Sequence, residues 1–125
     1  MLSDSEAFSG FAVSDPAAAK AFYTDVLGLR VTEENGLLTL HLGGGTTVLV
    51  YPKPDFTPAS FTVLNFPVAD IDAAVDDLIA RGVTFQRYPG LEADDKGVMR
   101  APAGQGPQIA WFTDPAGNIF SVLQT

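Results

Sequence analysis

The sequence has 125 residues but no cysteine, and it has a single histidine, His41. The absence of cysteine excludes disulfides, thiolate-bound metals and cysteine nucleophiles. Basic residues are also scarce. The chain has seven Lys and Arg but fifteen Asp and Glu, which gives a net charge of −8. Nucleic acids require a basic surface, so we expect no nucleic-acid partner. An acidic surface is compatible with a neutral or cationic ligand, and it is also typical of ordinary solvation.

Long apolar runs are missing too. No stretch is long enough to span a membrane, and the N-terminus, Met1-Leu2-Ser3-Asp4-Ser5-Glu6, is short and acidic, unlike a signal peptide. We therefore expect a cytoplasmic protein without a membrane partner. With 46% apolar and 18% charged residues, the chain is predicted to fold as one globular domain with its own core.

An internal repeat organises the chain. Val13-Ser14-Asp15, an alanine-rich stretch and Gly28 recur as Val68-Ala69-Asp70, a second such stretch and Gly82, and the two aspartates stand 55 positions apart. A repeat of this length predicts two similar units. Each aspartate is a predicted helix N-cap, and Pro16 at the first helical position supports this start.

Each half reads as β-α-β-β-β. In the first half, module 1 (about 7–51), we predict strands at 8–13, 29–33, 37–42 and 47–51 and a helix from Asp15 to Gly28, with a hairpin turn at Asn35-Gly36. The proline-rich segment 52–60 is the predicted linker. In the second half, module 2 (about 61–124), we predict a helix over 70–80 and strands at 61–68, 83–88, 108–113 and 118–123. Asp114-Pro115-Ala116-Gly117-Asn118 forms a tight turn.

The second half also carries a long loop, 89–107, rich in Gly, Pro and Asp, and loops of this length are functional or mobile. In this region Arg87 and Arg100 either pair with Asp94 and Asp95 or meet an anionic group of a ligand. Whether the loop is a lid or a solvated surface segment stays open.

Three motifs carry a resemblance over essentially the whole chain: the V-x-D junction between strand and helix, Phe22-Tyr23-Thr24-Asp25-Val26-Leu27-Gly28-Leu29, and the Asp-Pro-x-Gly-Asn turn. The chain resembles the vicinal oxygen chelate superfamily, which includes glyoxalase I, extradiol dioxygenases and bleomycin-resistance proteins. The resemblance implies one α+β domain, 1–125, in which two tandem βαβββ modules form curved mixed sheets around a cleft. It also implies a homodimer.

The resemblance further implies four positions at which metal-dependent members hold a divalent ion. In this sequence they are occupied by Phe8, Leu49, Val63 and Ser121. None of these offers an imidazole or carboxylate, and the single His41 stands on a different strand. We therefore expect a metal-free member without a cofactor.

Strand alternation predicts which residues line the cleft. It puts Phe8, Leu49, Tyr51, Val63, Asn65 and Ser121 on the inward face, where Asn65 and Ser121 are isolated polar groups in an apolar wall. A wall of this kind is typical of ligand pockets, although the same residues could fill a core between the halves. Trp111 and Phe112 must point to opposite faces, and we favour Trp111 for the cleft, where it could stack on a flat ligand.

The predicted function is sequestration of an apolar or aromatic compound without a metal, as in antibiotic resistance of the bleomycin-resistance type. The predicted ligand contacts are Phe8, Leu49, Tyr51, Val63, Asn65, Tyr88, Met99, Arg100, Trp111 and Ser121. The alternative is a metal-independent lyase or isomerase that uses His41 or a carboxylate, with Glu92, Asp94 and Asp95 as candidate bases. No catalytic residue is assigned.

Overall fold

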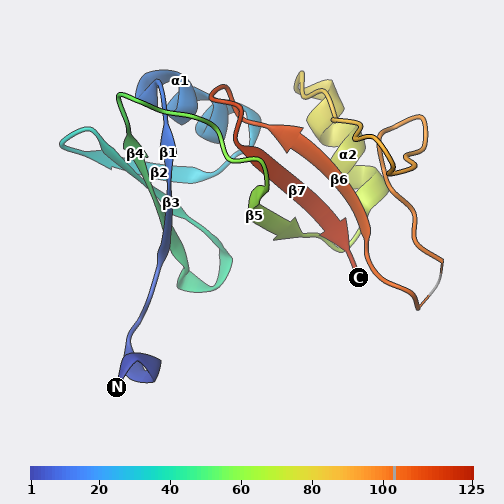
Figure 1. The fold of residues 1–125 in the computed structure, drawn as a ribbon, viewed down its shortest axis with the longest axis horizontal. Coiled ribbons are helices and arrows are strands. Elements are labelled where there is room, and N and C mark those ends of the chain that lie inside the picture. Colours follow the sequence, from blue (N-terminus) through green and yellow to red (C-terminus); the bar gives the residue numbers. More distant parts are fainter. Residues whose placement is uncertain (103) are drawn as a thin grey trace. The chain divides into compact units, whose positions relative to one another are not determined.

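The computed structural model describes residues 1–102 and 104–125, so residue 103 of the predicted loop 89–107 lies outside the described residues. The chain divides into two compact units, Met1–Pro58 and Ala59–Thr125. Each unit has one mixed β-sheet and one α-helix, and the sheets have four and three strands (Figure 1). The first unit also has short 3₁₀ turns at Leu2–Asp4 and Gly43–Gly45. The predicted α+β class is confirmed.

The first unit, which we call unit 1, has a sheet with the order β1-β4-β3-β2. Strands β1 and β4 run parallel, and the remaining neighbours are antiparallel. Its elements are β1 (Ser9–Val13), α1 (Pro16–Ala21), β2 (Arg30–Glu34), β3 (Leu37–His41) and β4 (Thr47–Pro52). This order matches the β-α-β-β-β reading of the sequence.

Helix α1 begins where the sequence predicts. The Asp15 carboxylate accepts hydrogen bonds from the amides of Ala17 and Ala18, at 3.1 and 3.3 Å. The helix then widens into a π-helical turn, Phe22–Val26, a change of helix type that our prediction of one helix from Asp15 to Gly28 did not include. Tyr23, inside this turn, is fully buried, and its ring meets that of Phe11 edge to face, at 6.5 Å between centroids. The turn therefore fills the core of unit 1.

The predicted hairpin of unit 1 is confirmed. Asn35 and Gly36 both have positive φ, 53° and 81°, which is the backbone of a type I′ turn. Alternate residues of the strands are buried on the side of α1, and they comprise Phe11, Val13, Leu38, Leu40, Val48 and Val50.

The second unit, unit 2, has a sheet with the order β5-β7-β6, in which β5 and β7 are parallel and β6 and β7 antiparallel. Its elements are β5 (Thr62–Pro67), α2 (Ile71–Ala80), β6 (Gln108–Thr113) and β7 (Ile119–Gln124). Helix α2 packs on one side of this sheet (Figure 1). That side carries the buried residues Ala110, Phe112, Phe120 and Val122.

The strand predicted at 83–88 is wrong. In this segment only Gln86 pairs with the sheet, through a single bridge to Trp111. A longer strand does not form here because a second segment pairs with the same free edge of β6, through the bridge between Met99 and Ile109. The two backbone hydrogen bonds between Met99 and Ile109, at 2.8 and 3.1 Å, occupy the edge that a longer strand would need.

Strand β5 contains a bulge that strand alternation did not reveal. Thr62 lies opposite Ile119, whereas Leu64 lies opposite Phe120, so the register shifts by one residue at Val63. Thr62 therefore shares the face of Ile119, and Asn65 shares the face of Ser121. The bulge corrects our prediction from strand alternation, which put Val63 on the same face as Asn65 and Ser121.

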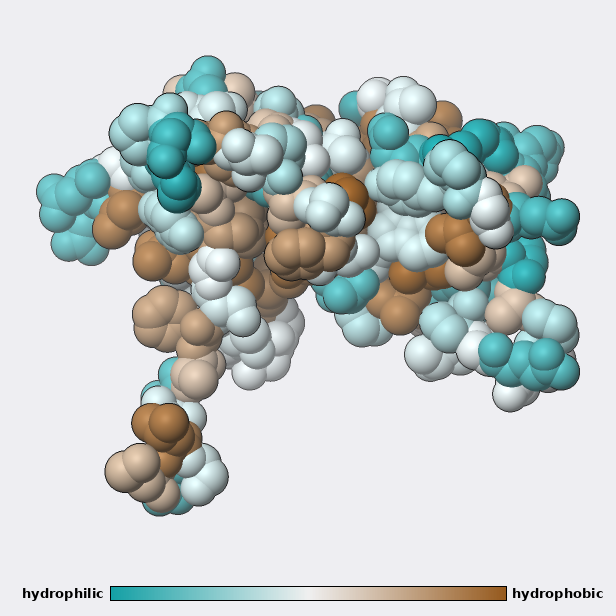
Figure 2. Space-filling model, in the orientation of Figure 1, coloured by the Kyte–Doolittle hydropathy of each residue, from teal (hydrophilic) through white to brown (hydrophobic). Residues whose placement is uncertain are grey.

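The N-terminal segment of unit 1 projects from its sheet, and its end is hydrophobic on the surface (Figure 2). Met1 and Leu2 are 97% and 78% exposed. Within the described part of the chain, no helix has the length and apolar character needed to cross a membrane.

Candidate functional site

The candidate site lies on the side of the unit 2 sheet that is turned away from α2. We call it the Trp111 face. The register of the three strands assigns to it Thr62, Asn65, Pro67, Ile109, Trp111, Thr113, Ile119, Ser121 and Leu123. The three strands, TVLNFP, QIAWFT and IFSVLQ, contain no charged residue. The face is therefore uncharged and combines apolar and aromatic side chains with neutral polar groups, a combination found in small-molecule sites.

Trp111 is held in one orientation on this face. Its indole Nε1–H donates a hydrogen bond to Thr62 Oγ1 at 3.1 Å. Trp111 is on β6 and Thr62 on β5, so the side chain reaches across β7, the strand between them. The hydrogen bond satisfies the one polar atom of the indole and leaves its π face for an apolar partner.

Tyr88 packs against the indole of Trp111. The two rings meet nearly at right angles, with centroids 5.7 Å apart and an interplanar angle of 78°. The partial burial of Tyr88 raises the pKa of its phenol, so the ring is neutral at physiological pH. Trp111 and Tyr88, both predicted ligand contacts, are therefore brought together.

Asn65 and Ser121 form a second pair on the Trp111 face. They lie opposite each other on β5 and β7, and Ser121 Oγ donates to Asn65 Oδ1 at 2.6 Å. Ser121 is fully buried, whereas Asn65 is exposed. Trp111, Ser121 and Asn65 stand in one row across the three strands. Met99 adjoins this face through its bridge to Ile109.

Two of the three predicted contacts in unit 1, Leu49 and Tyr51, lie on its sheet. Leu49 and Tyr51 occupy the side of β4 opposite α1, beside Gly10 and Ala12 of β1. Phe8 precedes β1 and is 65% exposed. His41 shares the side of Leu49, and its Nε2 forms a hydrogen bond with Thr32 Oγ1 at 2.9 Å.

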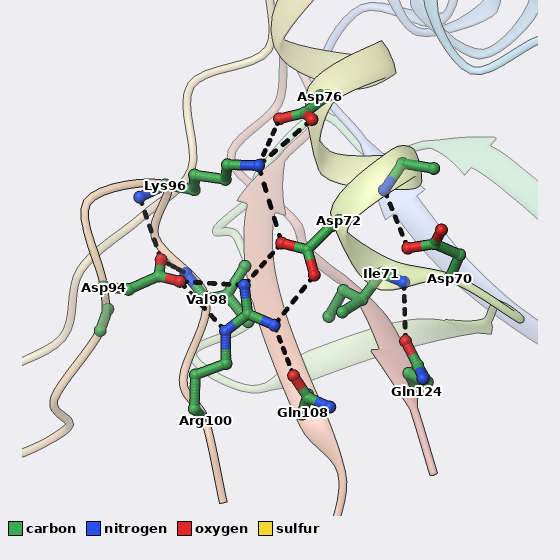
Figure 3. Close-up of polar contacts among 12 residues, drawn as sticks. Asp70, Ile71, Asp72, Asp76, Asp94, Lys96, Val98, Arg100, Gln108 and Gln124 are labelled. Atoms are coloured by element: carbon green, nitrogen blue, oxygen red, sulfur yellow. Dashed lines mark hydrogen bonds and ion pairs between the residues drawn. The ribbon is translucent and has the colours of Figure 1, made fainter.

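Arg100 takes part in an ion-pair network with helix α2 (Figure 3). Its guanidinium contacts Asp72 of α2 at 2.6 Å and Asp94 of the loop at 3.0 Å, and Nη1 also donates to Gln108. The hydrogen bond from Arg100 lowers the pKa of Asp72. Because α2 covers the other side of the sheet, Arg100 is not brought together with Trp111. The predicted pair of Arg100 and Asp94 is confirmed, and Asp72 is the partner that the sequence did not reveal.

Lys96 extends this network. Its Nζ lies 2.9 Å from Asp76 and 3.6 Å from Asp72, both on α2. The hydrogen bond with Asp76 raises the pKa of Lys96. Two cations of the loop and two carboxylates of the helix thus fasten 94–100 to α2, as Figure 3 shows.

A cavity of about 230 Å³ lies within this loop and is lined by Glu92, Ala93, Asp94, Val98 and Arg100. Two of its charged lining residues, Asp94 and Arg100, are hydrogen-bonded to each other. Asp94 Oδ1 accepts from the amides of Lys96 and Val98, and Oδ2 accepts from Arg100. Although desolvation alone would raise the pKa of Asp94, these hydrogen bonds hold it below its usual value. The carboxylate therefore acts here as a structural acceptor.

Comparison with known proteins identifies the family. Residues 8–122 match the model of the glyoxalase/bleomycin resistance protein/dioxygenase superfamily. The chain belongs to this superfamily. The resemblance inferred from the sequence motifs is thereby confirmed. No curated protein matches the chain significantly.

Solved structures of the superfamily share the fold. A member from Sphaerobacter thermophilus is 27% identical, with a TM-score of 0.71 and coverage of 99% of this chain and 100% of that one. TnmS3, an antibiotic-binding protein from a Streptomyces species, is 23% identical, with a TM-score of 0.67 and 97% of each chain covered. The fosfomycin resistance protein FosX from Listeria monocytogenes is 11% identical, with a TM-score of 0.71 and coverage of 98% and 93%.

The superfamily includes metal-dependent enzymes, so the four positions implied by the resemblance need a test of fit. Phe8, Leu49 and Val63 have no ligating atom in their side chains. The fourth position, Ser121, is buried, and its hydroxyl donates a hydrogen bond to Asn65. Among the described residues, no group of three or more His, Cys, Asp or Glu is arranged to hold a metal ion. The residues at these positions do not fit a divalent cation.

Proposed function

We propose that this protein binds a flat, apolar or aromatic small molecule on the Trp111 face and that it does so without a metal. The observation that carries the proposal is the indole of Trp111, which Thr62 orients by a hydrogen bond and against which the ring of Tyr88 packs nearly at right angles. A preorganised ring loses little conformational freedom when a ligand arrives. Stacking on it contributes about 0.5–1.5 kcal/mol beyond the burial of apolar area.

Binding without chemical change is supported by the state of two of the candidate bases, Asp94 and His41. Asp94 is engaged by two backbone amides and Arg100. His41 is on the sheet of unit 1, hydrogen-bonded to Thr32. The Trp111 face has no charged group on its strands that could act as a general base. A metal-independent lyase or isomerase is therefore the alternative outcome of the test below.

The relatives suggest which compounds to test first. TnmS3 is described as an antibiotic-binding protein, and FosX as a fosfomycin resistance protein. We propose that the ligand is an aromatic antibiotic or a compound of similar shape. Fosfomycin itself is small and not aromatic, so it serves as the comparison compound.

The test is equilibrium dialysis of the purified protein against a panel of aromatic antibiotics and fosfomycin, with mass spectrometry of the recovered compound and metal analysis of the protein. The proposal predicts that an aromatic compound is retained and recovered unchanged, and that the protein carries no stoichiometric metal. Recovery of an altered compound, with the alteration abolished by His41→Ala or Asp94→Asn, would establish the enzymatic alternative. Stoichiometric metal would overturn metal independence.

Several predictions of the sequence belong to this proposal. Phe8, Leu49 and Tyr51 of unit 1 and Val63 stay predictions of the sequence, each testable by substitution in the same dialysis. The predicted contact at Arg100 is not part of the Trp111-face proposal, because Arg100 pairs with Asp72 on the side of α2. A single domain over 1–125, a homodimer and a cytoplasmic location also stay predictions. Light scattering of the purified chain tests the dimer.

A further inference from the structure

We propose that Asn65 determines ligand specificity on the Trp111 face, and that it selects neutral planar compounds carrying an oxygen acceptor, such as a carbonyl or ether oxygen. This inference rests on the proposed function and narrows it to a chemical class. It follows from which polar atoms of this face already take part in hydrogen bonds and which can still donate one to a ligand.

The Asn65 amide is oriented by a buried partner. The Ser121 hydroxyl donates to Asn65 Oδ1 at 2.6 Å, and Ser121 is fully buried. The amide oxygen therefore has a partner, whereas no described residue accepts a hydrogen bond from Nδ2. Because Asn65 is exposed, its two N–H groups are available to an incoming ligand.

Thr62, the first residue of β5, also offers a hydrogen-bond donor on this face. Its Oγ1 accepts the hydrogen bond from Trp111 Nε1, and the hydroxyl hydrogen can still be donated. The bulge at Val63 is what puts Thr62 and Asn65 on one face. The β5 edge of the Trp111 face thus offers hydrogen-bond donors next to an aromatic plane.

The ligand is also expected to be neutral, because the three strands of this face contain no charged residue. A cationic ligand would find no carboxylate there, and an anionic ligand would find no Lys or Arg. The guanidinium of Arg100, in the loop, is paired with Asp72 and Asp94 on the side of α2. Burying a charged ligand group without a partner is costly, so a neutral acceptor is favoured.

Two neutral, planar, bicyclic probes test the inference. Coumarin carries a lactone with acceptor oxygens, and naphthalene has nearly the same size without an acceptor. Each is titrated into ¹⁵N-labelled protein, with Trp111 Nε1–H as the reporter, since the sequence has one Trp and hence one indole signal. Asn65→Leu removes the amide, and Asn65→Asp keeps an acceptor for Ser121 but replaces the donor. The matched control is Gln105→Leu, the same loss of an amide at an exposed loop position.

We expect Asn65→Leu to weaken coumarin binding roughly three- to tenfold, which corresponds to one neutral hydrogen bond, and to leave naphthalene binding within about twofold. Asn65→Asp should weaken coumarin at least as much, and Gln105→Leu should change neither. If both probes bind and Asn65→Leu affects them equally, or affects neither, the inference is overturned while the proposed function stands. If neither probe moves the Trp111 signal, the proposed function itself fails and the inference falls with it.

Discussion

The indole nitrogen of Trp111 donates a hydrogen bond to the hydroxyl oxygen of Thr62, 3.1 Å away on the far side of strand β7. This bond joins the two outer strands of the unit 2 sheet and fixes a planar aromatic surface over an uncharged face. A ligand that stacks on Trp111 meets a ring whose orientation is already set.

Thr62→Val tests this relationship, because it preserves the shape of the side chain and removes the acceptor. We expect a loss of about 0.5–1.5 kcal/mol in the free energy of unfolding, since the indole N–H loses its partner. We also expect weaker binding of aromatic probes by a few-fold, measured by equilibrium dialysis. Thr84→Val is the control, because Thr84 is an exposed threonine of the same unit. Equal effects of the two variants on binding would contradict the role of Thr62.

Gly97 is required by a close approach in the loop. Its φ is +91°, and a Cβ at this position would lie 2.8 Å from the Cβ of Phe85. Gly97→Ala should therefore lower the free energy of unfolding by about 2–4 kcal/mol, through both backbone strain and the clash. Gly90→Ala separates these causes, because Gly90 has φ +83° with nothing within 4 Å. It should cost only about 1 kcal/mol, and an equal loss in both variants by chemical denaturation would rule out the clash.

Arg100→Met removes the guanidinium that joins loop and helix and keeps most of the apolar stem. Because the pairs it makes with Asp72 and Asp94 are partly exposed, we expect a fall of only a few degrees in Tm. Amide hydrogen exchange should accelerate over 94–100, where the network fastens the loop to α2. Binding of neutral aromatic probes should stay unchanged. A large loss of that binding would instead make Arg100 a ligand contact.

The same network predicts a dependence of stability on pH. The pKa values of Asp72 and Asp94 are lowered in the folded protein, so both carboxylates stabilise the fold above their ordinary pKa of about 4. This stabilisation is lost as the pH falls through the lowered values. The difference in Tm between the protein and Arg100→Met should therefore be largest near pH 7 and shrink below about pH 4. Thermal unfolding at low salt measures it, and a difference that stays constant down to pH 3 would contradict the network.

Local signals made much of the fold predictable from the sequence. The Asp15 and Asp70 caps, the type I′ turn at Asn35-Gly36 and the turn that begins at Asp114 each depend on residues within a few positions. The Asp94 turn has the same chemistry as the Asp114 turn. In both, the aspartate Oδ1 accepts from the amides two and four residues later, and a glycine with φ near 91° stands at the third position.

Features that depend on contacts between distant segments were not predictable. The bulge at Val63 is set by the pairing of β5 with β7, and no residue type near it in the sequence indicates it. It decides that Thr62 meets Trp111, which is why strand alternation missed Thr62. The competition of Gln86 and Met99 for the edge of β6 likewise removed a predicted strand. Asp72 was overlooked as the partner of Arg100 because 28 residues separate them.

The most direct test of the account is the dissociation constant of an aromatic ligand from the dialysis panel, compared between the protein and Trp111→Leu. The substitution keeps an apolar side chain and removes the aromatic plane and its hydrogen bond to Thr62. If the ligand stacks on Trp111, the dissociation constant should rise roughly tenfold or more, because stacking and buried area are lost together. An unchanged dissociation constant, with the variant folded by circular dichroism, would contradict the Trp111 face as the binding site.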